Sequence, residues 1–164
     1  KIDHDWEVEY THPYSHQYAA SGDNTLVDGL KGGDEFRTGD WQGFYDNPFE
    51  ATIDLKELCE IESMSLGCVQ DIRPWIWLPE SVDFSFSQDG INYKLLESVA
   101  ESDESLMEKT FLLLSTSKIP KEKSYKKIIN TGKMKLPSSP TRKIFHKSST
   151  KKQHQNLRNE RIYG

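Results

Sequence analysis

The chain has 164 residues, of which 35% are hydrophobic and 11% aromatic, enough for one domain whose core relies on large aromatic side chains. Residues 1–116 hold 7 Lys and Arg against 24 Asp and Glu, a net charge of −17, whereas residues 117–164 hold 14 against 2, a net charge of +12. The acidic body argues against nucleic acid as a partner, because phosphate binding needs Lys and Arg clustered on a folded face. No apolar stretch approaches the roughly 20 residues that span a bilayer, so we expect no membrane insertion.

The sequence begins at Lys1 rather than at a methionine. We therefore interpret the chain as a piece of a longer protein, and the absence of a signal peptide says nothing about localisation.

Residues 1–47 contain few strand signals. Trp6, Val8 and Tyr10 alternate with polar residues, which predicts a short edge strand. The run 22–47 is rich in Gly, Asp and Asn, which predicts a long loop. A loop of this length inside a compact domain is usually functional or pinned by a metal.

Strand signals then follow at regular spacing. Alternating apolar and polar residues predict strands over 51–55, 61–69, 82–87, 93–99 and 110–114. Asp89-Gly90 predicts a tight hairpin turn, and no long helix is indicated. Short strands with turns at this spacing are typical of an all-β sandwich or barrel.

The last third is basic and less regular. Residues 125–129 and 144–145 predict two further strands. We assign a β-sandwich domain to residues 1–147, best defined over 13–116, and a disordered basic tail to 148–164. Cys59 and Cys68 are too few for a disulfide framework, and Cys68, in an apolar strand, is predicted to be a buried thiol.

Several short motifs occur in a fixed order between residues 13 and 98: Pro13-Tyr14-Ser15, Tyr18-Ala19-Ala20-Ser21, Val27-Asp28-Gly29, Thr38-Gly39-Asp40-Trp41, Ile53-Asp54-Leu55 and Phe84-Ser85-Phe86-Ser87-Gln88-Asp89-Gly90. This order resembles the discoidin-like domain, also called coagulation factor five/eight type C, of the galactose-binding-like superfamily. It looks most like the version appended to bacterial family 20 glycoside hydrolases, the β-N-acetylhexosaminidases or chitobiases. The resemblance implies a jelly-roll β-sandwich, galactose-binding-domain-like, of about eight antiparallel strands, with binding loops at one end. The family's closing acidic strand has no recognisable match here.

The resemblance also implies a structural calcium ion. Asp28 matches the aspartate of the family's calcium loop, and Asp23 and Thr38 lie in the same loop and could add oxygen ligands. In the alternative interpretation Asp28 stabilises its own turn by hydrogen bonding to nearby backbone.

Carbohydrate-binding candidates lie mainly in the Trp-rich segment 71–77. A ring such as that of Trp75 could stack on a sugar while Arg73 and Asp71 fix its hydroxyl groups. Alternatively, Trp75 and Trp77 project to one face of an extended segment and close the sandwich. Trp41 is expected to be a core residue. Weaker rim candidates are Arg37, Gln42 and Tyr45.

No catalytic arrangement is indicated. Asp34-Glu35 resembles the adjacent acid pair of family 20 enzymes, but that pair belongs to a (β/α)₈ barrel of about 250 residues. His12 and His16 have helical spacing for a metal, which Pro13 disfavours.

We therefore expect a non-catalytic accessory domain of an exported β-N-acetylhexosaminidase. It would bind a glycan of the N-acetylglucosamine or galactose type beside the catalytic domain of the same polypeptide. The alternative is a purely structural domain that packs on the catalytic barrel without binding sugar. An adhesion module ranks last, because the acidic body does not suit it.

Overall fold

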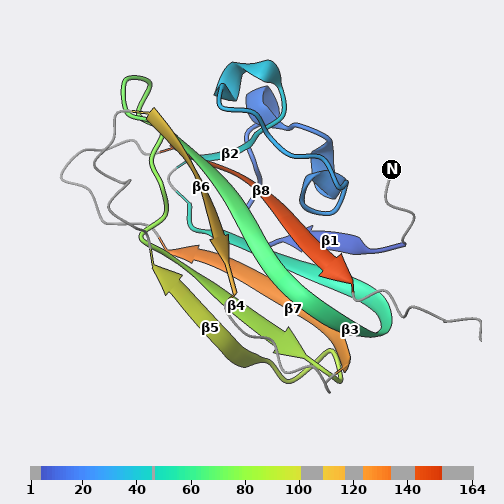
Figure 1. Cartoon of the computed structure of the whole chain (residues 1–164). Helices are drawn as coiled ribbons and strands as arrows, with labels where there is room; N and C mark the ends of the chain where they lie inside the picture. Colours follow the sequence, from blue (N-terminus) through green and yellow to red (C-terminus); the bar gives the residue numbers. More distant parts are fainter. Residues whose placement is uncertain (1–4, 46, 101–108, 117–123, 134–142, 153–164) are drawn as a thin grey trace, which may run out of the picture.

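The computed structural model describes residues 5–45, 47–100, 109–116, 124–133 and 143–152. They form a jelly-roll β-sandwich (Figure 1) in which every strand pairing is antiparallel, so the predicted fold class is confirmed. The strands are β1 (Glu7–Tyr10), β2 (Gln42–Tyr45), β3 (Phe49–Asp71), β4 (Ser81–Ser87), β5 (Lys94–Ala100), β6 (Lys109–Ser115), β7 (Ser124–Lys133) and β8 (Lys143–Lys152). The 3₁₀-helices are η1 (His16–Tyr18), η2 (Gly22–Leu26) and η3 (Phe36–Thr38).

Strand β3 belongs to both layers of the sandwich. Its first part pairs with β1 and β7, and β7 continues through β4 to β5. Its second part pairs with β6 and β8, and β8 pairs with β2. The two strands predicted over 51–55 and 61–69 are therefore one strand, and the predicted break between them is wrong.

A bulge in the middle of β3 explains how one strand serves two sheets. The register with β7 shifts between Asp54 and Cys59, and Lys56 has a left-handed backbone with φ of 65°. The Asp54 carboxylate accepts the Lys56 backbone N–H at 2.8 Å, and the Lys56 ammonium pairs with Glu7 on β1. Bulges of this kind bend a strand, which lets its second half enter the opposite layer.

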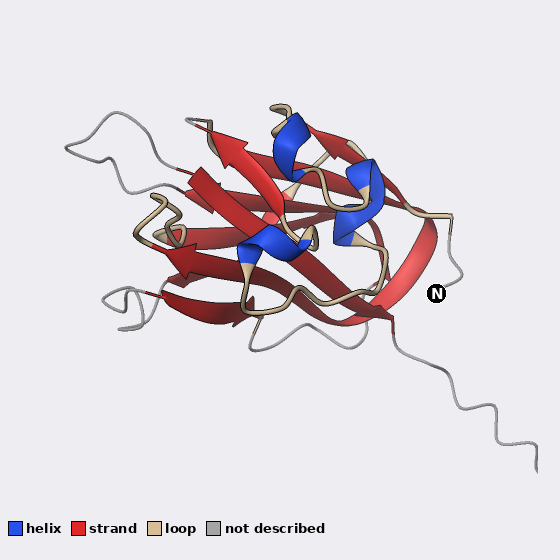
Figure 2. Ribbon diagram, turned by 90° about the horizontal axis from the view of Figure 1, so that it is seen from above, coloured by secondary structure: helices blue, strands red, loops and turns tan. Residues whose placement is uncertain are grey.

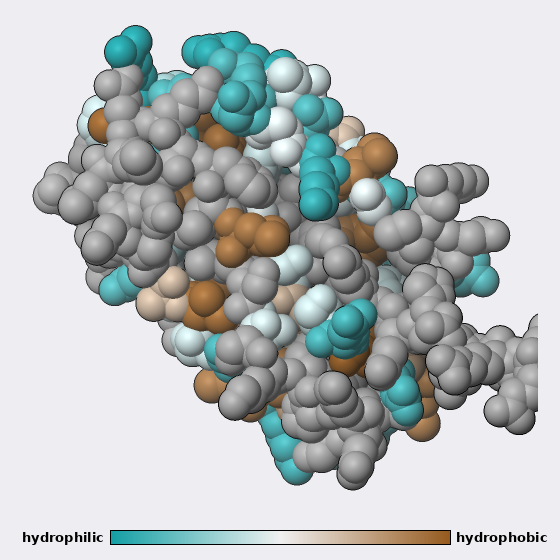
Figure 3. Space-filling model, in the orientation of Figure 1, coloured by the Kyte–Doolittle hydropathy of each residue, from teal (hydrophilic) through white to brown (hydrophobic). Residues whose placement is uncertain are grey.

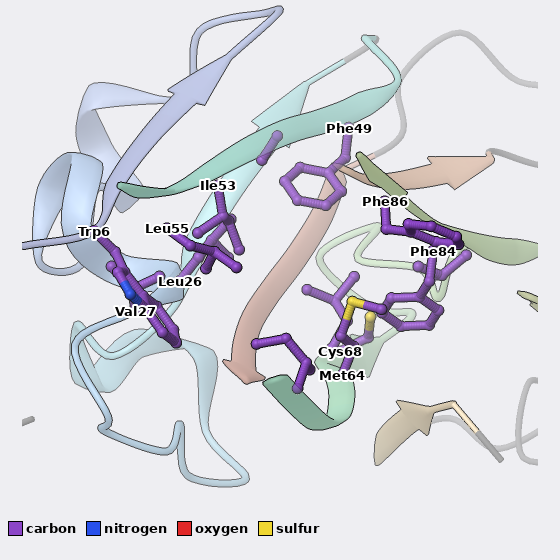
Figure 4. Close-up of a cluster of buried hydrophobic side chains, with 14 of the residues drawn as sticks. Trp6, Leu26, Val27, Phe49, Ile53, Leu55, Met64, Cys68, Phe84 and Phe86 are labelled. Atoms are coloured by element: carbon purple, nitrogen blue, oxygen red, sulfur yellow. The ribbon is translucent and has the colours of Figure 1, made fainter. Parts of the chain in front are cut away.

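The core lies between the layers and follows the predicted alternation. Phe49, Ala51, Ile53 and Leu55 are at most 1% exposed, and Figure 4 shows the ring of Phe84 on β4 beside Cys68. Ile61 is also buried although it has the same parity as the half-exposed Ser63, because the register with β8 shifts between these residues.

The edge strand predicted around Trp6 to Tyr10 is confirmed as β1. The run 22–47 is not a plain loop, since it contains η2, η3 and β2. Figure 2 shows the three short helices together on one side of the strands. No helix in the described parts of the chain is long and apolar enough to cross a membrane.

Beneath the helices lies a second, smaller core. Phe36, Trp41, Val69 and Ile76 form a buried cluster, and the partly buried Tyr18 packs against it. Trp41 is 1% exposed, as predicted, and its indole Nε1–H donates to the Gly33 carbonyl at 3.0 Å. This second core fixes the loops at one end of the sandwich.

Both strands predicted in the last third exist, as β7 and β8. The boundary between residues 147 and 148 is wrong, because β8 continues to Lys152 and pairs Ser149 with Ser65 of β3. The polar composition of residues 148–152 predicted disorder. A polar segment can nevertheless form a strand when its backbone pairs with a neighbouring strand, as β8 does with β3. Residues 153–164 lie outside the described residues.

The turn between β4 and β5 is longer than predicted. β4 ends at Ser87 and β5 begins at Lys94. The Asp89 carboxylate organises the connection by accepting hydrogen bonds from the Ser87 hydroxyl and from the backbone N–H groups of Ile91 and Asn92.

Both cysteines are buried free thiols, as predicted for Cys68. Burial raises the pKa of the Cys68 thiol well above its ordinary value, so this thiol stays protonated at neutral pH.

Candidate functional site

Trp75 lies at the tip of a short, rigid hairpin loop between β3 and β4. Asp71 and Ile76 exchange two backbone hydrogen bonds, at 3.1 and 2.9 Å, and the Trp75 N–H donates to the Ile72 carbonyl at 3.1 Å. Trp75 itself has φ of 67° and is 48% exposed. A left-handed backbone is a real outlier for a bulky residue and costs about 1–3 kcal/mol. The fold therefore holds a large aromatic ring half out of the protein in a strained conformation.

The base of this loop is anchored in the second core. Ile76, next to Trp75, is completely buried beside Phe36. Arg37 follows Phe36 in the chain, and its guanidinium carbon lies 4.4 Å from the centre of the Phe36 ring. The buried cluster therefore joins Phe36 of η3 to Ile76 at the base of the β3–β4 loop. Trp75 and Arg37 are thus each next in sequence to a residue of the same buried cluster, Ile76 and Phe36 respectively.

The polar candidates around Trp75 differ in accessibility. Arg73 is exposed within the same loop, whereas Asp71 is 9% exposed at its base. Arg37 is 65% exposed in its side chain and forms an ion pair with Glu35 at 3.2 Å. Arg73 and Arg37 are thus accessible from solvent, and the Asp71 backbone stabilises the loop.

Two of the weaker rim candidates have mainly structural contacts. Tyr45 is half-buried with its ring 6.4 Å from that of Tyr18, and burial raises its pKa. Gln42 is completely buried, and its Nε2 donates to the Gly22 carbonyl at 3.0 Å. The prediction that Gln42 lies on a ligand-binding rim is therefore wrong, because its side chain holds η2 against β2.

The three calcium candidates each make a separate contact. The Asp28 carboxylate accepts from the Ser21 hydroxyl at 2.7 Å and from the Leu30 N–H at 2.8 Å. Asp23 Oδ1 accepts from the Tyr14 hydroxyl, and the Thr38 hydroxyl donates to Asp40, at 2.8 and 2.7 Å. Within the described ranges no group of three or more His, Cys, Asp or Glu could hold a metal. Asp28 thus makes turn-stabilising hydrogen bonds of the kind that the alternative interpretation describes.

Sequence reasoning missed a hollow at the edge of β1. Its volume is about 400 Å³, and its lining includes Tyr10, Tyr14, His16 and Asp23. The Pro13-Tyr14-Ser15 motif was noted only as part of the family resemblance. An aromatic residue between Pro and His, followed by an acidic loop, was the available signal.

A further surface feature is the apolar hairpin between β4 and β5. Ile91 is 80% exposed, Leu95 60% and Tyr93 36%. On the face drawn in Figure 3, hydrophobic residues of the described parts of the chain are visible in several separate places.

Comparison with known proteins identifies relatives by fold. No protein-family model matches the chain, and no curated protein does either. Many solved structures are similar, among them a fucose-binding module from Streptococcus pneumoniae, with a TM-score of 0.58, 13% identity and coverage of 90% of this chain and 94% of that one. The family 32 carbohydrate-binding module of NanJ from Clostridium perfringens, solved with galactose, has a TM-score of 0.52 and 10% identity, and the match covers 88% and 93% of the two chains. The C-terminal domain of a chitobiase from Bacteroides fragilis has a TM-score of 0.50 and 15% identity, covering 91% and 94%.

Proposed function

We propose that this chain is a non-catalytic carbohydrate-binding accessory domain of an exported β-N-acetylhexosaminidase. The observation that carries the proposal is Trp75, a half-exposed ring on a rigid, strained hairpin with Arg73 in the same loop. Strain in a backbone persists where the surrounding structure enforces it, and such residues cluster at functional sites.

The chemistry of this end suits a sugar. The Trp75 ring would stack on the C–H face of a pyranose, while the guanidinium groups of Arg73 and Arg37 would donate hydrogen bonds to its hydroxyl or carbonyl oxygens. An N-acetylglucosamine or galactose unit offers both an apolar face and such acceptors. One small open site of this kind gives an affinity of about millimolar, equivalent to roughly 4 kcal/mol.

Weak binding is useful when the domain is tethered to an enzyme. A linker keeps the glycan-bound module near its catalytic partner at an effective concentration of about millimolar or higher. The fold similarity to the C-terminal domain of a chitobiase supports this parentage, and export follows from it, because polymeric glycans are met outside the cell. No separate reaction is assigned to Asp34-Glu35, since Glu35 pairs with Arg37.

The structural calcium ion stays a prediction. Each carboxylate oxygen of Asp28 accepts one hydrogen bond, from the Ser21 hydroxyl or the Leu30 N–H, and keeps a lone pair for a cation. Thermal unfolding with millimolar calcium and with a chelator tests this directly. A calcium-dependent rise in melting temperature supports the ion, and identical melting curves contradict it.

The sugar-binding proposal is tested by calorimetric titration with galactose, N-acetylglucosamine and chitobiose. The variant Trp75→Ala should weaken binding of the preferred sugar by about two- to tenfold, since a ring contact of this kind is worth about 0.5–1.5 kcal/mol. The matched control is Tyr93→Ala, which removes an exposed ring from the opposite hairpin. Equal affinity of wild type and Trp75→Ala, or no binding by wild type at tens of millimolar, contradicts the proposal.

The second candidate is a structural domain that packs on a catalytic barrel. It is favoured by the exposed Ile91, Leu95 and Tyr93 on the β4–β5 hairpin, because apolar side chains in one place mark protein contacts. If the full-length enzyme loses stability with Ile91→Ser and Leu95→Ser while sugar titrations of this chain are flat, this candidate replaces the first.

A further inference from the structure

A depression lies at the edge of the sandwich, and none of its lining residues belongs to the Trp75 loop. We call it the tyrosine hollow; it is an open depression of about 400 Å³ beside β1 and η1, lined by Val8, Glu9, Tyr10, Pro13, Tyr14, His16 and Asp23. A larger depression of about 560 Å³ adjoins it and shares Val8, Glu9 and Asp23. The two depressions therefore meet at these three residues.

The aromatic wall of the tyrosine hollow is rigid. The rings of Tyr10 and Tyr14 meet edge to face with centroids 5.5 Å apart, and both lie within 6.4 Å of the buried Phe44. The Tyr14 hydroxyl donates to Asp23 Oδ1 at 2.8 Å, and the Tyr10 hydroxyl donates to the Asp23 carbonyl at 3.3 Å. The hydrogen bond to Asp23 raises the pKa of Tyr14, so its hydroxyl remains a donor at neutral pH. The two tyrosines hold Asp23 at a fixed position.

Three polar groups of the hollow remain available to a ligand. Asp23 Oδ2, the Glu9 carboxylate and the His16 imidazole accept or donate no hydrogen bond within the described part of the chain. Glu9 and His16 are exposed. An aromatic wall with a few converging polar groups is the usual composition of a small-molecule site.

The charged side chains around the tyrosine hollow indicate which class of ligand it would bind. Glu7 and Asp54 line the adjoining depression together with Glu9 and Asp23, and the Lys56 ammonium contacts both Glu7 and Asp54. Among the side chains that the structure describes, four carboxylates line this depression and the Lys56 ammonium contacts two of them, so negative charge is in excess there. This excess repels sugars bearing carboxylate or sulfate and attracts a protonated amine, because hydrogen bonds between ionised groups are the strong ones.

We propose that the tyrosine hollow is a second glycan subsite, which takes a sugar residue carrying a protonated primary amine, such as a 2-amino-2-deoxyhexose. The pyranose ring packs against Tyr14 and Pro13, and the ammonium group lies between Asp23 Oδ2 and the Glu9 carboxylate. The site goes beyond the proposed function and differs from it chemically, since Trp75 has arginines beside it and the tyrosine hollow has carboxylates.

The test is an NMR titration of the whole isotopically labelled chain with glucosamine trimer and, separately, with N-acetylglucosamine trimer. These ligands differ in the charge on nitrogen. The proposal predicts saturable shifts of the Tyr14, His16 and Asp23 amides with the amine, and at least about tenfold weaker binding of the acetylated trimer at these residues. Equal binding of the two trimers in the hollow, or shifts with the amine confined to the Trp75 loop, overturns it.

Variants separate this site from the first one. Asp23→Asn keeps the acceptor for the Tyr14 hydroxyl but removes the charge, and we expect at least about tenfold weaker binding of the amine. Glu62→Gln is the matched control, because it removes one exposed carboxylate that lines neither depression. Unchanged affinity in Asp23→Asn, or equal losses in both variants, overturns the proposal.

Trp75→Ala distinguishes failure of the two proposals. It should leave amine binding at the tyrosine hollow unchanged and reduce binding of neutral sugars at the Trp75 loop. Loss of amine binding in Trp75→Ala overturns the second subsite, whereas flat titrations with neutral sugars alone contradict only the proposed function at Trp75.

Discussion

The second core depends on the close approach of Gly32 to Trp41. A Cβ atom added to Gly32 would lie 2.5 Å from both Cε2 and Cζ2 of the Trp41 indole. Trp41 cannot move aside easily, because it is 1% exposed among Phe36, Val69 and Ile76 and donates a hydrogen bond to Gly33. Gly32→Ala should therefore overpack this cluster.

The neighbouring glycine supplies a matched control. A Cβ added to Gly33 meets nothing within 4 Å. Both substitutions to Ala reduce the freedom of the unfolded chain by the same amount, so the difference between the two variants reports the clash alone. Overpacking of a close-packed core costs about 1–3 kcal/mol, which for a domain of this size lowers the melting temperature by roughly 2–12 °C.

The measurement is calorimetric unfolding of wild type, Gly32→Ala and Gly33→Ala under the same conditions. We expect Gly33→Ala to melt at or slightly above the wild-type temperature and Gly32→Ala clearly below it. Equal melting temperatures for the two variants would refute the argument that Trp41 fills the space beside Gly32.

Three further predictions concern the hairpins and the thiols. Hydrogen bonds from the backbone N–H and the side chain of Asn92 hold the pKa of Asp89 below its ordinary value. The stabilising contribution of the Asp89 carboxylate is therefore present above about pH 4 and is lost as the pH falls further. Urea unfolding between pH 7 and pH 2 should show that the difference in unfolding free energy between wild type and Asp89→Ala shrinks in acid, and a constant difference would contradict this. Iodoacetamide should leave Cys59 and Cys68 unmodified in the native protein and label both in urea, because both are buried, and rapid native labelling of Cys68 would be inconsistent with its burial. Trp75→Ala should change the free energy of unfolding by at most about 0.5 kcal/mol, because the Trp75 ring is half exposed. A larger loss of stability would mean that the ring closes the sandwich.

The strands could be predicted where apolar and polar residues alternate. Phe49 to Leu55 and Val82 to Phe86 show this pattern, and their inward side chains are buried as expected. The continuity of β3 could not be predicted, because it depends on a bulge at Lys56 that Glu7 of another strand stabilises. The extension of β8 to Lys152 likewise depends on pairing with β3 rather than on its own polar composition.

The candidate site was predictable only in part. The Trp-rich loop was identified, but whether Trp75 or Trp77 faces solvent depends on the left-handed backbone of Trp75. Extended geometry would have placed the two rings on one face. The burial of Gln42 could not be predicted, because it depends on the strand β2, in which the side-chain amide donates a hydrogen bond to the Gly22 carbonyl. The tyrosine hollow combines residues from β1, η1 and η2, which no local pattern brings together.

The central claim is that Trp75 binds sugar, and the indole N–H of Trp75 is its most direct reporter. We would titrate the isotopically labelled chain with N-acetylglucosamine, galactose and chitobiose, and follow the Trp75 side-chain resonance, assigned by its absence in Trp75→Ala. The account predicts a saturable shift of this resonance with at least one of the sugars, while the buried indole of Trp41 stays in place. A Trp75 resonance that does not move up to tens of millimolar of every sugar would contradict it.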